Sequence, residues 1–272
     1  PVSTGLYGIY SYYTYGKNRS TVYRNNNIHD LPYLNASNSS TTNYINTWNG
    51  LYAYYNYGNT TYPLIVEKNN QTNIMTYYYV YNFYMYYNYV VDLKGNTIDN
   101  VRAYLSGYSN YPFYIMYGSD YNITGNTIKN SRFNESGSSG YVYPFYIYYV
   151  YNTYRSVNLF EDNVIQDNAF GYYFYGAYIW YYSSWKINRN TIARNNSIYS
   201  NGYFYAMYFY YLYNVECTSN LIYDNYGYYG NYNFYTYNYN SGYTANFRQN
   251  TLQYKVPSNG YAYHFAYGYI IQ

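Results

Sequence analysis

The sequence predicts an all-β protein, a parallel β-helix (solenoid) in which the chain winds through stacked rungs of about 30 residues each. Three observations lead to this prediction: the composition, a motif that recurs near every thirtieth residue, and the alternation of apolar residues around that motif. Among 272 residues, 61 are tyrosine and 42 are asparagine, and only 9% are charged. Tyr, Thr, Ile, Val and Phe favour strands, Asn and Gly favour bends, and helix-forming residues are scarce.

The low charge excludes several classes of protein. Coiled coils, basic nucleic-acid tails and acidic disordered tails all need dense charge, and a net charge of +3 is too small to favour a nucleic-acid partner. One cysteine allows no internal disulfide and no cysteine-rich zinc site, and two histidines leave little for a histidine metal site. We therefore expect no cofactor. The uncharged stretch 69–91 contains too many Asn and Tyr residues for a transmembrane helix.

The repeated motif is an asparagine followed two positions later by isoleucine or leucine, and its period is near thirty, with one longer interval followed by one shorter interval. The asparagines are Asn96, Asn126, Asn163, Asn190, Asn220 and Asn250, and the apolar residues are Ile98, Ile128, Ile165, Ile192, Ile222 and Leu252. The residues five and seven positions before each isoleucine are mostly apolar, and they share one strand face because strand side chains alternate. We expect the asparagines to lie at a bend and to form a hydrogen-bonded ladder, with the isoleucines facing inward.

A second column of inward side chains is predicted inside the tyrosine-rich stretches. Its members are Phe174, Phe204, Phe234 and His264, which follow one another with the same period as the motif. Stacked phenylalanines form an apolar ladder in such a core. We expect His264 to stack or cap at the last rung, with a general-base role as the alternative.

The asparagine motif, with an apolar residue three positions before it, resembles the right-handed parallel β-helix superfamily, the pectin-lyase-like fold. The resemblance covers about residues 90–260 and implies a right-handed coil. This fold hosts lyases, hydrolases, adhesins and viral spikes, so the resemblance indicates fold more than activity. We expect a non-catalytic member. The composition, rich in Tyr and Asn and poor in charge, also resembles surface and virion proteins of archaea from hot, acidic habitats.

The charged residues agree with this alignment, which rests on asparagine and isoleucine alone. We expect opposite charges to meet on adjacent rungs, and no like charges to face each other there. The predicted ion pairs join Asp99 with Lys129, Asp162 with Arg189, Asp167 with Arg194, Arg194 with Asp224, and Lys186 with Glu216. Such pairs stabilise the register by a few tenths of a kcal/mol each.

The regular repeat predicts one continuous domain with two regions, irregular rungs or a cap over residues 1–75 and a regular β-helix over 76–272. In the first region Asn26 and Ile28 match the motif, whereas Ile74 has Thr72 in the asparagine position. The polar stretch 34–43 is predicted to be a surface loop. The longest interval contains an insertion at 133–140, which is predicted to be an exposed, flexible loop.

The strongest candidate for chemistry is the acidic cluster Glu161, Asp162 and Asp167. Enzymes of the resembled family use clustered carboxylates, or calcium with a basic residue, to cleave acidic polysaccharides. The cluster is therefore either a carboxylate or calcium site or a set of structural ion pairs, and we favour the ion pairs. Cys217 falls in an inward column and is expected to be a buried, inert thiol. His29 has no partner that we can name.

Eight asparagines begin an Asn-x-Ser/Thr sequence and are candidates for N-glycosylation, although the composition alone would give about six by chance. They are Asn18, Asn35, Asn38, Asn59, Asn70, Asn122, Asn134 and Asn195. Asn35, Asn38, Asn59 and Asn134 are the most persuasive, because we expect them in loops.

Tyrosine on both strand faces predicts a broad amphipathic outer surface, suited to other subunits or to sugars. The sequence starts at Pro1 without a signal peptide, so we expect a processed form or a fragment. Our first hypothesis is an extracellular, glycosylated structural protein whose copies assemble end to end and side by side into a filament or sheath. The alternatives are a viral tail fibre or spike that attaches to host-surface glycans, and a polysaccharide lyase or hydrolase.

Overall fold

The computed structural model describes residues 5–31, 45–105, 107–237, 244–253, 255–256 and 260–266. Within these residues the regular elements are β-strands that pair in parallel, and they form a solenoid with about 30 residues per rung. This confirms the predicted fold class. The same residues contain no helix that could cross a membrane.

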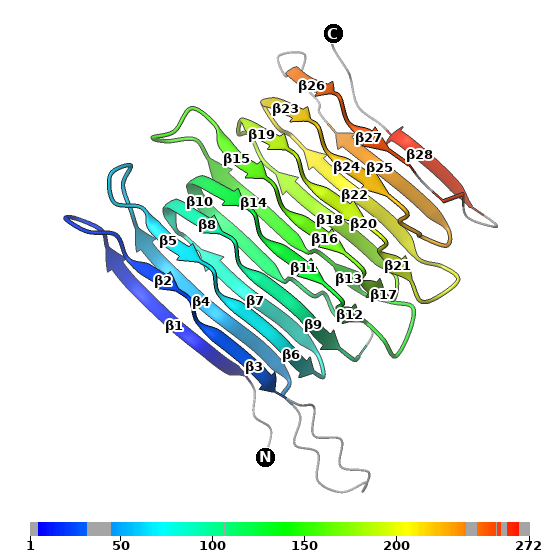
Figure 1. The fold of residues 1–272 in the computed structure, drawn as a ribbon, viewed down its shortest axis with the longest axis horizontal. Helices are drawn as coiled ribbons and strands as arrows, with labels where there is room; N and C mark the ends of the chain where they lie inside the picture. The colour runs from blue at the N-terminus through cyan, green and yellow to red at the C-terminus, as the bar shows by residue number, and fades with distance from the viewer. Residues whose placement is uncertain are drawn as a thin grey trace, which may run out of the picture.

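Each rung is a flattened loop of chain built from three sets of strands, and the chain runs along the first set and returns across the other two (Figure 1). The first set contains β1 (Leu6–Tyr15), β4 (Thr47–Tyr57), β7 (Tyr79–Tyr86), β10 (Phe113–Thr124), β13 (Tyr141–Val142), β14 (Phe145–Tyr151), β18 (Tyr173–Trp180), β22 (Tyr203–Tyr210), β25 (Gly230–Tyr237) and β28 (Tyr261–Ala266). The second set contains β2 (Val22–Arg24), β5 (Leu64–Glu67), β8 (Tyr89–Lys94), the end of β10, β15 (Asn158–Glu161), β19 (Trp185–Asn188), β23 (Asn214–Thr218) and β26 (Thr244–Arg248).

The third set follows the asparagine bend. It contains β3 (Asn27–Leu31), β6 (Asn70–Thr76), β9 (Thr97–Ala103), β11 (Thr127–Lys129), β12 (Arg132–Phe133), β16 (Val164–Gln166), β17 (Ala169–Phe170), β20 (Thr191–Ala193), β21 (Asn196–Ser197), β24 (Leu221–Tyr223) and β27 (Thr251–Leu252). The apolar core lies between the first set and the returning sets. Phe145 shows this, because its ring stacks on Phe113 of the first set at 4.5 Å and meets Phe160 of the second set edge-on at 5.0 Å.

The predicted inward columns are present in the strand register. Ile98 pairs with Ile128, and the column continues through Ile165, Ile192 and Ile222 to Leu252. The column five residues earlier also holds, from Leu93 through Cys217 to Phe247. A period read from six short motifs was therefore sufficient to align the second and third sets of strands.

The second predicted column is wrong beyond its first pair. Phe174 pairs with Phe204, but Phe204 then pairs with Asn231, and Phe234 pairs with Met207. The cause is a shorter connection, because paired residues are closer in sequence from β22 to β25 than from β18 to β22. His264 therefore lies outside the phenylalanine column, and its Nδ1 is 2.9 Å from Nδ2 of Asn233.

The described residues of the first 75 continue the same solenoid, since β1 pairs with β4 and β3 with β6 in parallel. Ile74, which departs from the motif in sequence, is not the motif residue of its rung. Gln71 occupies the inward position between Ile28 and Ile98, and Asn69 is the ladder residue. Gln71 is buried, accepts a hydrogen bond from the indole of Trp48 at 2.9 Å and donates one to the carbonyl of Asn82. The predicted loop 34–43 lies outside the described residues.

The insertion that produces the longest interval lies mainly elsewhere than predicted. Ser119 pairs with Tyr151, whereas Asn122, only slightly further along β10, pairs with Leu159. Most of the extra chain therefore forms the connection between β14 and β15. Phe133 and Asn134, at the start of the predicted exposed loop, are buried.

Each rung bends at residues with positive φ, which only glycine adopts at little cost. At the bend before the ladder asparagine, Gly95 and Gly125 fill this position in two rungs, with φ of 61° and 65°. Lys68, Asp162 and Arg189 take the same conformation in others, with φ of 53°, 56° and 54°. The bend thus recurs with different side chains, because the ladder that follows it fixes the backbone.

Candidate interaction surface

The outward side chains of the first set of strands form two continuous tyrosine ladders along the solenoid. The first ladder is Tyr10, Tyr52, Tyr84, Tyr114, Tyr146, Tyr178, Tyr208 and Tyr235, and the second is Tyr81, Tyr111, Tyr143, Tyr175, Tyr205, Tyr232 and Tyr263. Successive ring centroids in the first ladder lie 4.5–5.5 Å apart with interplanar angles of 8–22°. The second ladder has the same spacing, with angles of 1–22°. These distances follow from the spacing of parallel strands.

The two ladders also pack against each other, with rings of one ladder nearly perpendicular to rings of the other. Tyr175 and Tyr178, for example, lie 5.9 Å apart at 86°, and the same arrangement recurs in the neighbouring rungs. Ring faces are therefore covered by ladder neighbours, and some edges by the other ladder. A sugar ring has no free aromatic face to stack on inside the ladders, which limits the sugar-binding interpretation of these tyrosines.

This surface, the tyrosine face, carries no formal charge. The first-set strands contain no Asp, Glu, Lys or Arg apart from the buried Asp120 near the end of β10. Burial raises the pKa of Tyr52 to about 12, and burial followed by neighbouring tyrosines raises the pKa of Tyr84 and Tyr114. The hydroxyls of these three tyrosines consequently stay neutral at physiological pH.

A third tyrosine column marks the bend at the end of the first set. Tyr55 and Tyr87 have φ of 54° and 53°, and their rings stack at 4.8 Å with an interplanar angle of 1°. Tyr149 and Tyr181, further along the same column, stack at 3.9 Å. Side chains are rare at positive φ, so the stacked rings compensate a backbone cost of about 1 kcal/mol per residue.

The opposite, returning side of the solenoid carries the predicted asparagine ladder. Each ladder asparagine donates its backbone N–H and its Nδ2–H to Oδ1 of the asparagine on the next rung, as Asn96 does to Asn126 at 3.0 and 2.9 Å. The same pattern runs through all six predicted residues. Asn26 and Asn69 extend it toward the N-terminus.

A second amide ladder, which the sequence reading missed, lies one bend later. Asn168 donates to Oδ1 of Asn195, and Asn195 donates to Oδ1 of Asn225, at side-chain distances of 2.8 and 2.9 Å. These residues follow the first ladder by five positions at the same spacings. This repeated spacing in the sequence is a signal that predicts a second ladder.

Four of the five predicted ion pairs are present. The expectation that like charges never stand on adjacent rungs is wrong, because Arg102 pairs with Arg132, and both arginines contact Glu135. The nearest N–O distances are 3.3 Å for Asp99 with Lys129, 2.8 Å for Asp162 with Arg189, 2.6 Å for Asp167 with Arg194, and 3.9 Å for Lys186 with Glu216. The pair between Arg194 and Asp224 was predicted wrongly. Arg194 instead donates from Nη1 to the hydroxyl of Tyr223 at 2.7 Å, while its Nε and Nη2 donate to Asp167.

The acidic cluster is engaged by arginines. Arg189 contacts Glu161 at 3.2 Å as well as Asp162, and the hydrogen bonds from Arg194 lower the pKa of Asp167. Within the described residues, no group of three His, Cys, Asp or Glu side chains could hold a metal ion. The cluster therefore has the form of structural ion pairs between rungs.

Asp120 is a buried acid that the sequence reading did not single out. It is 0% exposed, and its carboxylate accepts the backbone N–H groups of Thr153, Tyr154 and Arg155 at 2.9–3.1 Å. The guanidinium of Arg155 donates to the Asp120 carbonyl at 3.0 Å and to Asp92 at 3.1 Å. This acid thus anchors the longer connection between β14 and β15.

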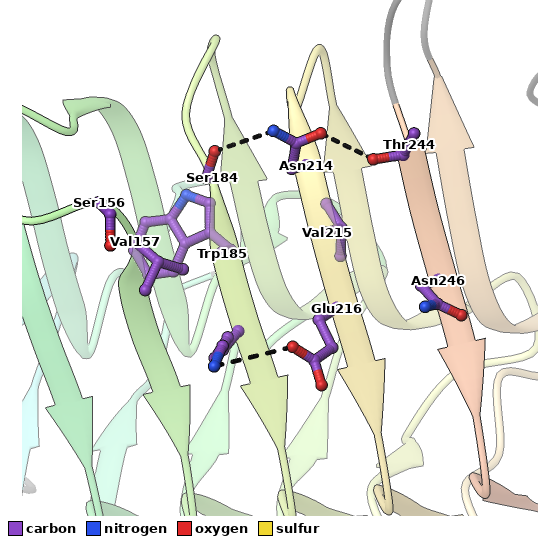
Figure 2. A pocket seen from close by; sticks show the side chains of 10 residues that line it. Ser156, Val157, Ser184, Trp185, Asn214, Val215, Glu216, Thr244 and Asn246 are labelled. Carbon is purple, nitrogen blue, oxygen red and sulfur yellow. Dashed lines mark hydrogen bonds and ion pairs between the residues drawn. The ribbon is translucent and has the colours of Figure 1, made fainter.

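A shallow groove of about 330 Å³ crosses β19, β23 and β26 on the returning side (Figure 2). Asn214 donates to Ser184 Oγ at 3.5 Å and accepts from Thr244 at 2.7 Å, and Lys186 faces Glu216 at 3.9 Å. Trp185 lies beneath and is only 1% exposed. The groove is thus lined by polar groups and offers no exposed aromatic ring.

Cys217 is fully buried, and burial raises the pKa of its thiol, as expected for an inert residue. His29 is exposed and lies 2.9 Å from a carboxylate oxygen of Asp30. Neither histidine shares a site with the acidic cluster in the described structure.

The glycosylation candidates fall in different environments. Asn18 and Asn70 are exposed, Asn59 and Asn122 are half-buried with hydrogen-bonded side chains, and Asn35 and Asn38 lie outside the described residues. Asn134 and Asn195 are 0% exposed, so the expectation that Asn134 lies in an exposed loop is wrong. The Nδ2 of Asn195 donates to Ile165 and Asn225, which leaves no room for a glycan in the folded chain.

Comparison of the chain with protein-family models, with curated proteins and with solved structures finds no match. The function is therefore inferred from the geometry alone.

Proposed function

We propose that the chain is a non-catalytic structural subunit of an extracellular filament or sheath, in which copies of the solenoid associate through the tyrosine face. The observation that carries the proposal is that face itself, a continuous, uncharged aromatic surface on one side of the molecule. Tyrosine contributes a large contact area at low entropic cost and is enriched in protein interfaces. Extended aromatic surfaces of this kind usually have a partner.

The partner that fits best is a second copy. The face presents hydroxyl ends and ring edges in rows at the spacing of parallel strands, and an identical face has the same spacing. The absence of charge in its strands removes repulsion between like faces. Among the described strands, β1 pairs only with β4 and β28 only with β25, which also supports end-to-end growth.

The proposed setting is extracellular. Asn18 and Asn70 are exposed glycosylation candidates and support this setting. We further propose that the chain belongs with the right-handed parallel β-helices of the pectin-lyase-like superfamily. A polysaccharide lyase or hydrolase has less support, because the carboxylates of Asp162 and Asp167 are held by arginines.

The test is electron microscopy and sedimentation of the native protein across a range of concentrations. We expect fibres or sheets with an axial repeat of roughly 40 Å, from eight or nine rungs at about 4.8 Å. Tyr86 lies beside the first ladder, with its ring stacked on Tyr54 at 5.3 Å and 5.9 Å from Tyr84. The variant Tyr86→Lys therefore places a charge next to the tyrosine face and should keep the protein dispersed. The matched control, Leu221→Lys, changes a 37% exposed residue on the returning side and should still assemble.

A native protein that stays monodisperse at every concentration contradicts the proposal, as does equal assembly of both variants. Circular dichroism of each variant separates lost association from lost folding.

A second candidate function is attachment to surface glycans, as in a viral fibre or spike. The polar groove over β19, β23 and β26 favours it, because rows of hydroxyl and amide groups suit sugar hydroxyls. Glycan-array binding that is lost in Asn214→Ala, by a protein that forms closed oligomers, would favour this candidate over the filament.

A further inference from the structure

The first tyrosine ladder is continuous through eight rungs, and its described N-terminal end is open to water. Tyr10 is 60% exposed and stacks on Tyr52 at 5.1 Å. Tyr7, which is 50% exposed, meets Tyr10 at 5.6 Å and Tyr52 at 5.4 Å. Within the described residues, Tyr52 is therefore the aromatic link that joins this exposed pair to the rest of the ladder.

Phenols differ from other stacked side chains because they can be oxidised by one electron with loss of a proton. Stacked rings in van der Waals contact allow the electron vacancy to move from ring to ring. Burial raises the pKa of Tyr84 and Tyr114, so proton release is disfavoured along the interior of the ladder. At Tyr10, water can accept the proton, which makes this end the place where the oxidised state is trapped.

We propose that the first ladder is a one-electron relay and that Tyr10 is its reactive end, where an oxidised ladder bonds covalently to a second phenol. The oxidant is hydrogen peroxide acting through a haem peroxidase. One peroxide takes one electron and one proton from each of two phenols and becomes two waters. The two phenoxyl radicals join through their ortho carbons, and each ortho carbon then loses its proton to its own ring oxygen. The product has lost two hydrogen atoms relative to the two phenols.

This inference does not rest on the proposed assembly, because the second phenol can be a small molecule. The experiment therefore uses dilute full-length protein, peroxide, peroxidase and excess tyramine, and peptide mass spectrometry locates the tyramine adducts. Tyr154 is the internal reference, since it is 65% exposed and has no ring beside it among the described residues. Exposure alone predicts at least as much adduct at Tyr154 as at Tyr10.

We expect several-fold more adduct at Tyr10 than at Tyr154. Tyr52→Phe preserves the stacked ring but cannot form a phenoxyl radical, so adduct at Tyr10 should fall to the level at Tyr154, which should itself be unchanged. Tyr235→Phe, at the far end of the same ladder, is the control and should change Tyr10 little. Adduct that follows exposure in the native protein, or a Tyr10 yield that Tyr52→Phe leaves unaltered, overturns the relay.

Discussion

The two sides of this solenoid hold neighbouring rungs together by different interactions. On the returning side, the ladder asparagines from Asn69 to Asn220 lie at 0–3% exposure, and their amides bond from rung to rung. On the tyrosine face, rung-to-rung contact is made by ring stacking at the surface. Amide bonds fix the register by direction and distance, whereas ring contacts tolerate substitution by other rings, as Trp180 between Tyr148 and Tyr210 shows.

The comparison indicates that the amide ladder mainly stabilises the fold and that the tyrosine face is mainly available for association. The amide ladder holds the backbone at a bend with positive φ and has no outward surface to offer. The tyrosine face adds less to the register and leaves its hydroxyl rows available. We therefore expect substitutions in the two ladders to separate stability from association.

The largest expected effect comes from breaking the asparagine ladder in the middle. Asn163 accepts from Asn126 and donates to Asn190 and to the Ile123 carbonyl. Asn163→Leu keeps the number and branching of the side-chain heavy atoms but leaves buried donors and an acceptor without partners, at about 1–3 kcal/mol each. Urea denaturation should show a loss of about 3 kcal/mol or more in the free energy of unfolding. If Asn163→Leu lost less unfolding free energy than a substitution in the tyrosine ladder, the amide ladder would not be the main source of stability.

A smaller loss is expected from the acid that anchors the β14–β15 connection. Asp120→Asn keeps one oxygen acceptor but loses the carboxylate charge that accepts three backbone N–H groups. We expect about 2 kcal/mol of destabilisation and faster proteolytic cleavage within residues 152–157. Cleavage elsewhere, with this connection intact, would show that Asp120 does not hold it. Asp99→Asn, on the exposed surface, is the matched control.

The sequence predicted the register of the second and third sets of strands, because each regular rung there has one position that accepts only asparagine. Asn at the first bend has no substitute in the regular rungs, so its column is readable by eye. Gln71 escaped because an amide replaces the usual isoleucine there, supported by Trp48 and Asn82. The phenylalanine column was predicted wrongly because the connections between rungs vary in length. A constant spacing of phenylalanines along the sequence does not reveal that the connection from β22 to β25 is shorter.

The tyrosine face could be predicted only in outline. Alternation placed tyrosines outward, but the stacking of their rings depends on the register of the first set of strands, which the asparagine motif does not determine. Tyr55 and its equivalents at positive φ were not foreseeable, since tyrosine is uncommon in that conformation. Asp120 has no repeat in the described rungs, because only one of them has the longer connection.

A substitution in the first tyrosine ladder is expected to cause the third-largest loss of stability. Tyr146 stacks between Tyr114 and Tyr178 at 5.5 and 5.3 Å. Tyr146→Leu removes both stacks and should cost about 1–2 kcal/mol in the free energy of unfolding, whereas Tyr146→Phe keeps the rings and should cost less than about 0.5 kcal/mol. Equal losses for the two variants in urea denaturation would place the stability in the hydroxyl instead of the ring.

The smallest effect is the pH dependence of one ion pair between rungs. Arg194 lowers the pKa of Asp167 in the folded chain, so the folded state binds a proton at this site less readily than the unfolded state. The stabilisation is therefore complete above the unfolded pKa of about 4 and is lost as the pH falls through the lower folded value. Both side chains are about one-third exposed, so solvent screening limits the contribution to a few tenths of a kcal/mol.

Arg194→Gln removes the cause of that pKa shift while leaving Asp167 in place. The variant should be slightly less stable than the native protein at pH 7, and the difference should shrink as the pH falls below about 4, measured by urea denaturation at each pH. Asn163→Leu should instead lower stability by the same amount at each pH, because no titrating group takes part in the amide ladder. If the loss of stability depended on pH in the same way for both variants, the ion pair and the amide ladder would not stabilise the returning side independently.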